Sequence, residues 1–187
     1  MNTVDSDILL VGGDKGAVTM KATDGEVVAT FDSGDNVAAA WSPDAEVVAT
    51  GRYGRPYSIE LRSGRRTGEL LLTLEGHTAS VWDLAFVGPG RLASASDDKS
   101  VRVFDVSGGG GRGTVVNEWK HGGRQKAVAC TPDGVWLASG GDDKRVHTHD
   151  LRAPSDRGGD GIDVGSIVFS LAFRPADANT LAAGLAR

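Results

Sequence analysis

The chain has 187 residues, of which 27 are glycine and 40% are hydrophobic, and its formal net charge is −5 at pH 7. This length is typical of one domain with a substantial core. The acidic balance and the scattered basic residues argue against direct binding of nucleic acid or of an anionic membrane surface. A single cysteine, Cys130, excludes an internal disulfide framework and favours a reducing compartment.

The first residues lack the basic region and the long apolar run of a signal peptide. No apolar stretch approaches the roughly 18 residues that a membrane-spanning helix needs. We therefore expect a cytoplasmic or nuclear protein.

Short apolar or alternating runs bounded by Gly, Pro, Asp and Asn recur along the chain, which predicts strands rather than helices. The runs group into a unit of three strands, three units of four strands and a shorter last unit. The predicted strands, in chain order, lie at 8–11, 17–20 and 26–31; at 37–41, 47–51, 57–61 and 70–74; at 81–86, within 92–99, at 101–105 and near 115–119; at 126–130, 135–139, 145–150 and near 162–164; and at 168–173 and 181–184.

The units also repeat in sequence. The residues that end each first strand, Trp41, Phe86, Cys130 and Phe173, recur at intervals of 43 to 45 residues. The most complete copy runs over 76–105, from a Gly-His pair to a Phe-Asp pair. A period of roughly 40–45 residues with a Gly-His start and a Trp-Asp-like end is typical of propeller blades.

The sequence resembles the WD-repeat (WD40-type) family over nearly its whole length. The resemblance implies an all-β fold, a β-propeller of four-stranded antiparallel blades, with about four and a half blades in an incomplete or open ring. Most propellers of the family close with seven blades, so we expect a partial or truncated member. Alternatively, the last strand could complete the three-stranded first unit and close a small ring. The expected single domain covers 1–187, with blade units of about 1–33, 34–75, 76–120, 121–165 and a partial 166–187.

The resemblance further implies a hydrogen-bonded tetrad inside a blade, made by a loop His, a Ser or Thr, a turn Asp and a Trp. In the third unit His77, Ser94 and Asp98 match, and Phe104 replaces the Trp.

In the fourth unit Ser139 and Asp143 match, His121 could supply the loop His, and His149 occupies the Trp position. We expect only the third and fourth blades to be locked in this manner.

The third-unit set also contains the residue types of a hydrolase triad. Ser94, however, lies inside a predicted strand and lacks the Gly-x-Ser-x-Gly elbow that exposes a nucleophile. Asp98 can accept a hydrogen bond from His77, so the network satisfies itself. We predict a structural role for these residues, and no enzyme.

His147 and His149 lie two residues apart on a predicted strand, so their side chains share one face. That spacing could begin a metal site, but no nearby Cys or third His completes it in the sequence. We predict no metal and no other cofactor.

The function that the resemblance implies is a non-catalytic scaffold for protein–protein interactions. Loops on a rigid scaffold commonly carry binding residues. Trp82 could line the mouth of the central channel or belong to the core between blades. The candidate partner-binding residues are Arg52, Tyr53, Arg55, Trp82, Lys99, Lys144, Arg145 and Arg152.

Alternatives remain open. The segment 149–152, His-Asp-Leu-Arg, resembles the Trp-Asp-x-Arg box by which some family members dock onto the adaptor of a cullin-type ubiquitin ligase, with His in place of Trp. A subunit of an RNA-processing or ribosome-biogenesis assembly is another alternative. A propeller enzyme is the alternative of a different class, and it would need convergent acid–base groups at the channel mouth. An open arc would also expose apolar faces and strand edges, so we expect self-association.

Overall fold

The computed structural model describes residues 8–13, 16–21, 27–31, 36–64, 68–88, 90–108, 113–153, 160–174 and 180–186. All regular secondary structure in these ranges is β-strand, and they contain no helix long and apolar enough to cross a membrane.

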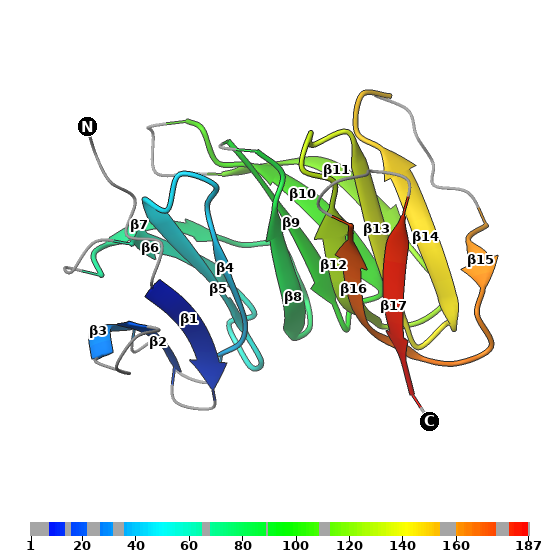
Figure 1. The fold of residues 1–187 in the computed structure, drawn as a ribbon, viewed down its shortest axis with the longest axis horizontal. Helices are drawn as coiled ribbons and strands as arrows, with labels where there is room; N and C mark the ends of the chain where they lie inside the picture. Colours follow the sequence, from blue (N-terminus) through cyan, green and yellow to red (C-terminus); the bar gives the residue numbers. More distant parts are fainter. Residues whose placement is uncertain are drawn as a thin grey trace.

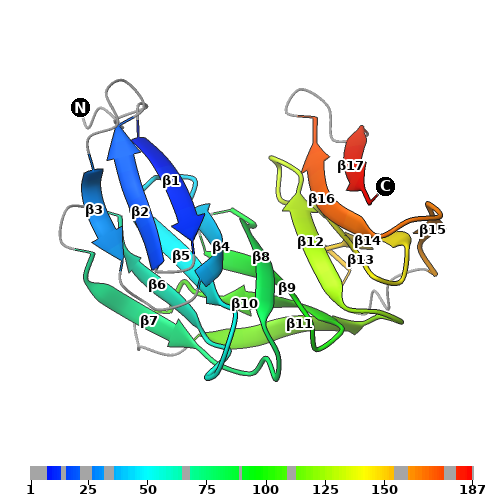
Figure 2. The same cartoon turned by 90° about the horizontal axis from the view of Figure 1, so that it is seen from below.

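The strands form five separate antiparallel sheets, arranged one after another along an open arc (Figures 1 and 2). The first sheet has three strands, three sheets have four strands each, and the last has two. The strands are β1 (Ile8–Gly13), β2 (Gly16–Lys21) and β3 (Val27–Phe31); β4 (Asn36–Trp41), β5 (Val47–Arg52), β6 (Ile59–Ser63) and β7 (Leu70–Leu74); β8 (Val81–Phe86), β9 (Arg91–Ser96), β10 (Ser100–Asp105) and β11 (Thr114–Lys120); β12 (Gln125–Cys130), β13 (Trp136–Gly141), β14 (Arg145–Asp150) and β15 (Ile162–Asp163); and β16 (Val168–Phe173) and β17 (Leu181–Leu185).

Each predicted strand corresponds to an observed one. The ends differ by no more than two residues, except that the strand expected within 92–99 ends at Ser96 in β9. This agreement confirms the all-β blade architecture. In each four-stranded sheet consecutive strands are neighbours, so every blade is an up-and-down meander.

The ring does not close among the described strands. β16 pairs only with β17, whereas β1, β2 and β3 form their own sheet at the other end of the arc. Figure 2 shows the two end sheets facing each other across the opening. The alternative that 168–173 completes the first blade is therefore wrong, because β16 instead packs beside β12 and β13 of the preceding blade.

The hydrophobic core lies between neighbouring sheets. Ile59 and Leu74 of the second blade meet Val81 and Leu92 of the third in one cluster of buried side chains. The faces of the third and fourth blades enclose a second cluster, which includes Val101, Trp119, Val128 and Leu137. Because each central sheet is covered on both faces, its strands carry apolar residues on both sides, as stacked blades require. Burying each such side chain contributes about 1.5–3 kcal/mol.

Candidate functional site

The third blade contains a continuous hydrogen-bonded chain of three side chains. The Nδ1 atom of His77 lies 2.8 Å from Asp98 Oδ2, and its Nε2 atom lies 2.7 Å from Ser94 Oγ. A carboxylate can only accept, so Nδ1 carries a proton and donates to Asp98. The Nε2 atom makes the hydrogen bond with Ser94 Oγ, in which the direction of donation depends on the protonation of the ring. The chain fixes the loop before β8 to the β9–β10 turn.

Asp98 is the centre of this network. Its carboxylate also accepts the main-chain N–H and the hydroxyl of Ser100, at 2.9 Å and 2.6 Å, and the main-chain N–H of Thr78 at 3.1 Å. Burial opposes ionisation, but the hydrogen bond and the charge of His77, together with the Ser100 hydrogen bonds, hold the pKa of Asp98 well below its ordinary value. The carboxylate therefore stays ionised inside the blade.

Ser94 lies as close to His77 as a catalytic serine lies to its histidine, but it is not accessible to solvent. Its residue surface is 0% exposed within β9. Phe104, itself 1% exposed, packs edge-on against the ring of His77 with centroids 6.2 Å apart. The Ser94 hydroxyl is therefore closed to solvent, and its hydrogen bonds connect loop, strand and turn.

The fourth blade does not reproduce this network. Asp143 accepts a hydrogen bond from His147 Nε2 at 2.9 Å, and the ring of His121 stacks on that of His147 with centroids 3.9 Å apart. Within the part of the chain that the structure describes, the buried Ser139 hydroxyl has no hydrogen-bond partner. The expected lock of His121, Ser139 and Asp143 is therefore wrong, because the ring of His147 occupies the place beside the carboxylate.

Aromatic rings continue this stack into the core. His149 is fully buried and lies on Trp119 with centroids 4.1 Å apart, and it is 5.6 Å from His121 in a tilted arrangement. Burial, and to a lesser extent the neighbouring His147, lowers the pKa of His121 to about 4. The imidazole of His121 is therefore neutral at pH 7.

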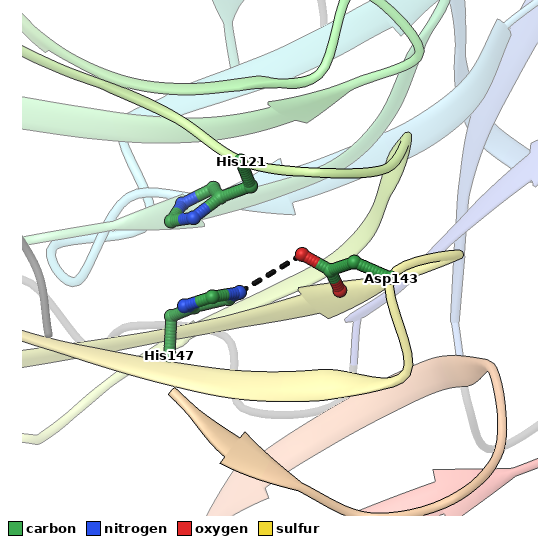
Figure 3. A group of neighbouring side chains, drawn as sticks. All are labelled: His121, Asp143 and His147. Carbon is green, nitrogen blue, oxygen red and sulfur yellow. Dashed lines mark hydrogen bonds and ion pairs between the residues drawn. The ribbon is translucent and has the colours of Figure 1, made fainter. Parts of the chain in front are cut away.

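His121, Asp143 and His147 bring together the donor atoms of a metal site (Figure 3). One donor atom from each of the three side chains lies within 4.8 Å of the other two. Sequence reasoning paired His147 with His149 and missed this cluster. The signal was present in the repeat, since His121 and Asp143 align with His77 and Asp98, which touch in the third blade.

A second cluster joins three blades at one rim. Tyr53, from the β5–β6 loop, lies edge-on to Trp82 of β8 with ring centroids 5.5 Å apart. Lys126 Nζ of β12 lies 3.8 Å from the centre of the Trp82 ring and 2.7 Å from Asp97 Oδ1. Tyr53 is 48% exposed. Trp82 is thus part of a composite surface. Lys126 was not among the predicted binding residues, although it aligns with Trp82 in the repeat.

The basic candidates Arg55, Lys99 and Lys144 belong to connections between the second and third strands of blades, and Arg52 is the last residue of β5 at the same rim. Lys99 and Lys144 have φ angles of 69° and 61°, so both turns place a lysine in the left-handed region.

Arg145, the first residue of β14, is held by a hydrogen bond from its Nε atom to Asp160 O at 2.6 Å. Arg152 follows the other end of β14 and lies on the opposite rim. Its guanidinium donates from Nε and Nη2 to Asp150 at 2.9 Å and 2.7 Å, and this pairing lowers the pKa of Asp150 to about 2. The predicted partner-binding residues therefore divide between two rims.

Known proteins share this repeat. Residues 68–105 and 113–150 match the family model described as WD domain, G-beta repeat. WD repeat-containing protein SL1-17 of Schistosoma mansoni is 31% identical over 153 residues, which cover 81% of this chain and 46% of that protein. WD repeat and SOCS box-containing protein 1 of Takifugu rubripes is 43% identical over 82 residues, which cover 43% of this chain and 19% of that protein.

The fold comparison agrees. A chain in the crystal structure of the mitotic checkpoint complex superposes with a TM-score of 0.80 and 23% sequence identity, over 96% of this chain and 54% of that one. Blades, repeat and superposition together define a β-propeller-type repeat protein. Two of its blades carry WD repeats, and the chain is similar to WD repeat-containing proteins. It spans about half the length of the Schistosoma relative and about a fifth of the fish relative.

Proposed function

We propose that the chain is a non-catalytic platform for protein–protein interactions, and that its partner binds the rim formed by Tyr53, Trp82 and Lys126. The observation that carries the proposal is the composite surface itself. Three consecutive blades each contribute one side chain to it, and an exposed aromatic ring lies at its edge. WD-repeat propellers bind other proteins, so a partner protein is the expected occupant.

The physical character of this rim suits a binding hot spot. Tyr and Trp offer large, stiff, partly apolar surfaces, and such residues dominate the energetics of protein interfaces. Asp97 neutralises Lys126, and Lys126 in turn fixes the Trp82 ring, so little side-chain entropy is lost when a partner docks. The platform is pre-organised by contacts between blades.

A photo-crosslinking experiment tests this proposal. A benzoylphenylalanine side chain is placed at Tyr53 or, as the matched control, at Trp136, an exposed aromatic residue near the opposite rim. We expect a defined protein to be crosslinked from position 53 and not from position 136. Trp82→Ala should remove that product, since truncating an aromatic hot spot commonly costs about 2 kcal/mol or more. Equal products from both positions would contradict the proposed rim.

A second candidate function is substrate adaptor of a cullin-type ubiquitin ligase. It is favoured by the exposed Arg152, which is paired with Asp150 in the His-Asp-Leu-Arg segment, and by similarity to proteins named WD repeat and SOCS box-containing protein 1. Recovery of the ligase adaptor in a pull-down should fall with Arg152→Ala and remain with Arg124→Ala, another exposed arginine. Equal recovery with both variants would remove this candidate.

A further inference from the structure

The cluster of His121, Asp143 and His147 lies outside the proposed partner rim and has the composition of a transition-metal site. The three side chains come from different elements: the loop after β11, the β13–β14 turn and β14 itself. Figure 3 shows the two imidazole rings stacked above one another beside the carboxylate. An imidazole binds a metal ion in its neutral form, so two such ligands with one carboxylate would present one negative charge to a divalent cation.

One ring nitrogen in the cluster lacks a hydrogen-bond partner. The Nε2 atom of His121 is buried, and no described residue hydrogen-bonds to it. A buried polar atom without a partner costs about 1–3 kcal/mol, so such an atom in a folded protein calls for a water molecule or an ion. A metal ion would use the lone pair of this nitrogen directly.

The distances are close to those that an ion would impose. With bonds of about 2.0–2.2 Å from zinc to nitrogen and oxygen, donor atoms in a tetrahedral site lie about 3.3 Å apart. His147 Nε2 and Asp143 Oδ2 are already 2.9 Å apart, and no pair of donors in the cluster exceeds 4.8 Å. Bringing the most distant pair of donors to this spacing needs a shift of about 1.5 Å. The two stacked imidazole rings must also turn relative to each other, so that the in-plane lone pairs of both ring nitrogens point at one ion.

We infer that His121, Asp143 and His147 form a site for Zn²⁺ or a similar divalent transition metal. Histidine and carboxylate ligands suit zinc, which binds four ligands in structural sites and keeps one position open where the protein supplies three. Water would occupy the fourth position, because His121 and Asp143 are only partly buried. The ion would tie the loop after β11 to the β13–β14 turn, which in the third blade is done by the His77–Asp98 hydrogen bond.

Calorimetric titration of the whole chain with Zn²⁺ tests this inference. We expect one ion per chain, and affinity reduced by at least about tenfold in His121→Gln and in Asp143→Asn, since each change removes one of only three protein ligands. His149→Phe is the matched control: it removes a neighbouring histidine of the same stack and installs the residue found at the equivalent position of the third blade, Phe104. This variant should bind zinc as the unmodified chain does.

A second measurement covers variants that fold poorly. In NMR spectra of the unmodified chain, Zn²⁺ should shift the ring signals of His121 and His147 and leave those of His77 unchanged. Co²⁺ in the same site should give the visible absorption of a tetrahedral complex. The inference is overturned if the chain binds no zinc, if both ligand variants keep the affinity, or if the signals of His77 shift instead.

Discussion

Asp83 of the third blade accepts the main-chain N–H of Val128 of the fourth blade at 2.9 Å, so one buried carboxyl joins two neighbouring inner strands. Its other oxygen accepts the N–H of Leu84 at 2.9 Å. Burial raises the pKa of Asp83 to about 6, because the two hydrogen bonds only partly offset the loss of hydration. A contact between blades is therefore sensitive to pH.

The stability of the chain should carry a component from Asp83 that decreases between about pH 4 and pH 6. The folded-state pKa of this carboxyl lies above its unfolded value of 3.8. Its contribution is therefore fully present below pH 3.8 and is lost as the pH rises through about 6. The full change is at most about 3 kcal/mol, from roughly 1.4 kcal/mol per pKa unit. Urea denaturation at a series of pH values measures it.

Comparison with Asp83→Asn isolates this component. His121, whose pKa is lowered, changes the stability in the opposite direction over the same range, so only the difference between the chain and the variant is diagnostic. The difference in unfolding free energy between the unmodified chain and Asp83→Asn should therefore vary with pH. The exposed carboxyl of Asp105 provides the control, because Asp105→Asn removes no buried acid. A difference that stays constant from pH 4 to pH 7 would contradict the prediction.

Replacing Asp98 with alanine should destabilise the third blade by about 1–3 kcal/mol, because His77 and Ser100 lose a buried acceptor. Chemical denaturation measures the loss. Asp142→Ala serves as the control in the corresponding turn, where the carboxylate is partly exposed and lies 4.0 Å from Arg124. That change should cost less than about 0.5 kcal/mol. Equal effects of the two substitutions would show that the network is not a lock.

Lys126→Met should destabilise the chain by about 1 kcal/mol, since it removes both a short ion pair with Asp97 and the contact with the Trp82 ring. The same substitution at Lys120, an exposed side chain 4.0 Å from Glu118, should have almost no effect. Thermal melting of both variants tests the difference. An unchanged melting temperature for Lys126→Met would mean that the rim contact contributes nothing to folding.

The isolated chain should self-associate through its last sheet. Phe169 and Leu185 are 57% and 44% exposed there, on strands that no further blade covers among the described residues. Light scattering should show an average molecular mass that rises with protein concentration. The Phe169→Ser variant should show a smaller rise. Leu71→Ser, at an exposed position in β7, should leave the association unchanged. A stable monomer at every concentration would refute this prediction.

The sequence predicted the strands well because blade faces impose their pattern locally. The apolar runs around 81–86 and 168–173 and the turn residues between strands are visible without any tertiary information. The period of the repeat then placed equivalent residues at equivalent points of successive blades.

Side-chain partners were less predictable, because several neighbouring side chains can donate to the same carboxylate and the three-dimensional packing decides which of them does. The alignment of the repeats predicted that His121 would pair with Asp143. Instead His147, four residues further along the chain, donates its hydrogen bond to that carboxylate. The contact of Lys126 with Trp82 crosses from one blade to the next, and such contacts are not encoded in the pattern of either blade alone.

Geometric templates for serine hydrolases would select His77, Ser94 and Asp98 in this chain, since both template distances are met to within hydrogen-bonding range. The false match would be rejected by one added criterion, the solvent exposure of the nucleophile, which is zero for Ser94. Template searches across repeat proteins should therefore score accessibility together with distance, because every blade that keeps a His–Ser–Asp lock offers the same decoy.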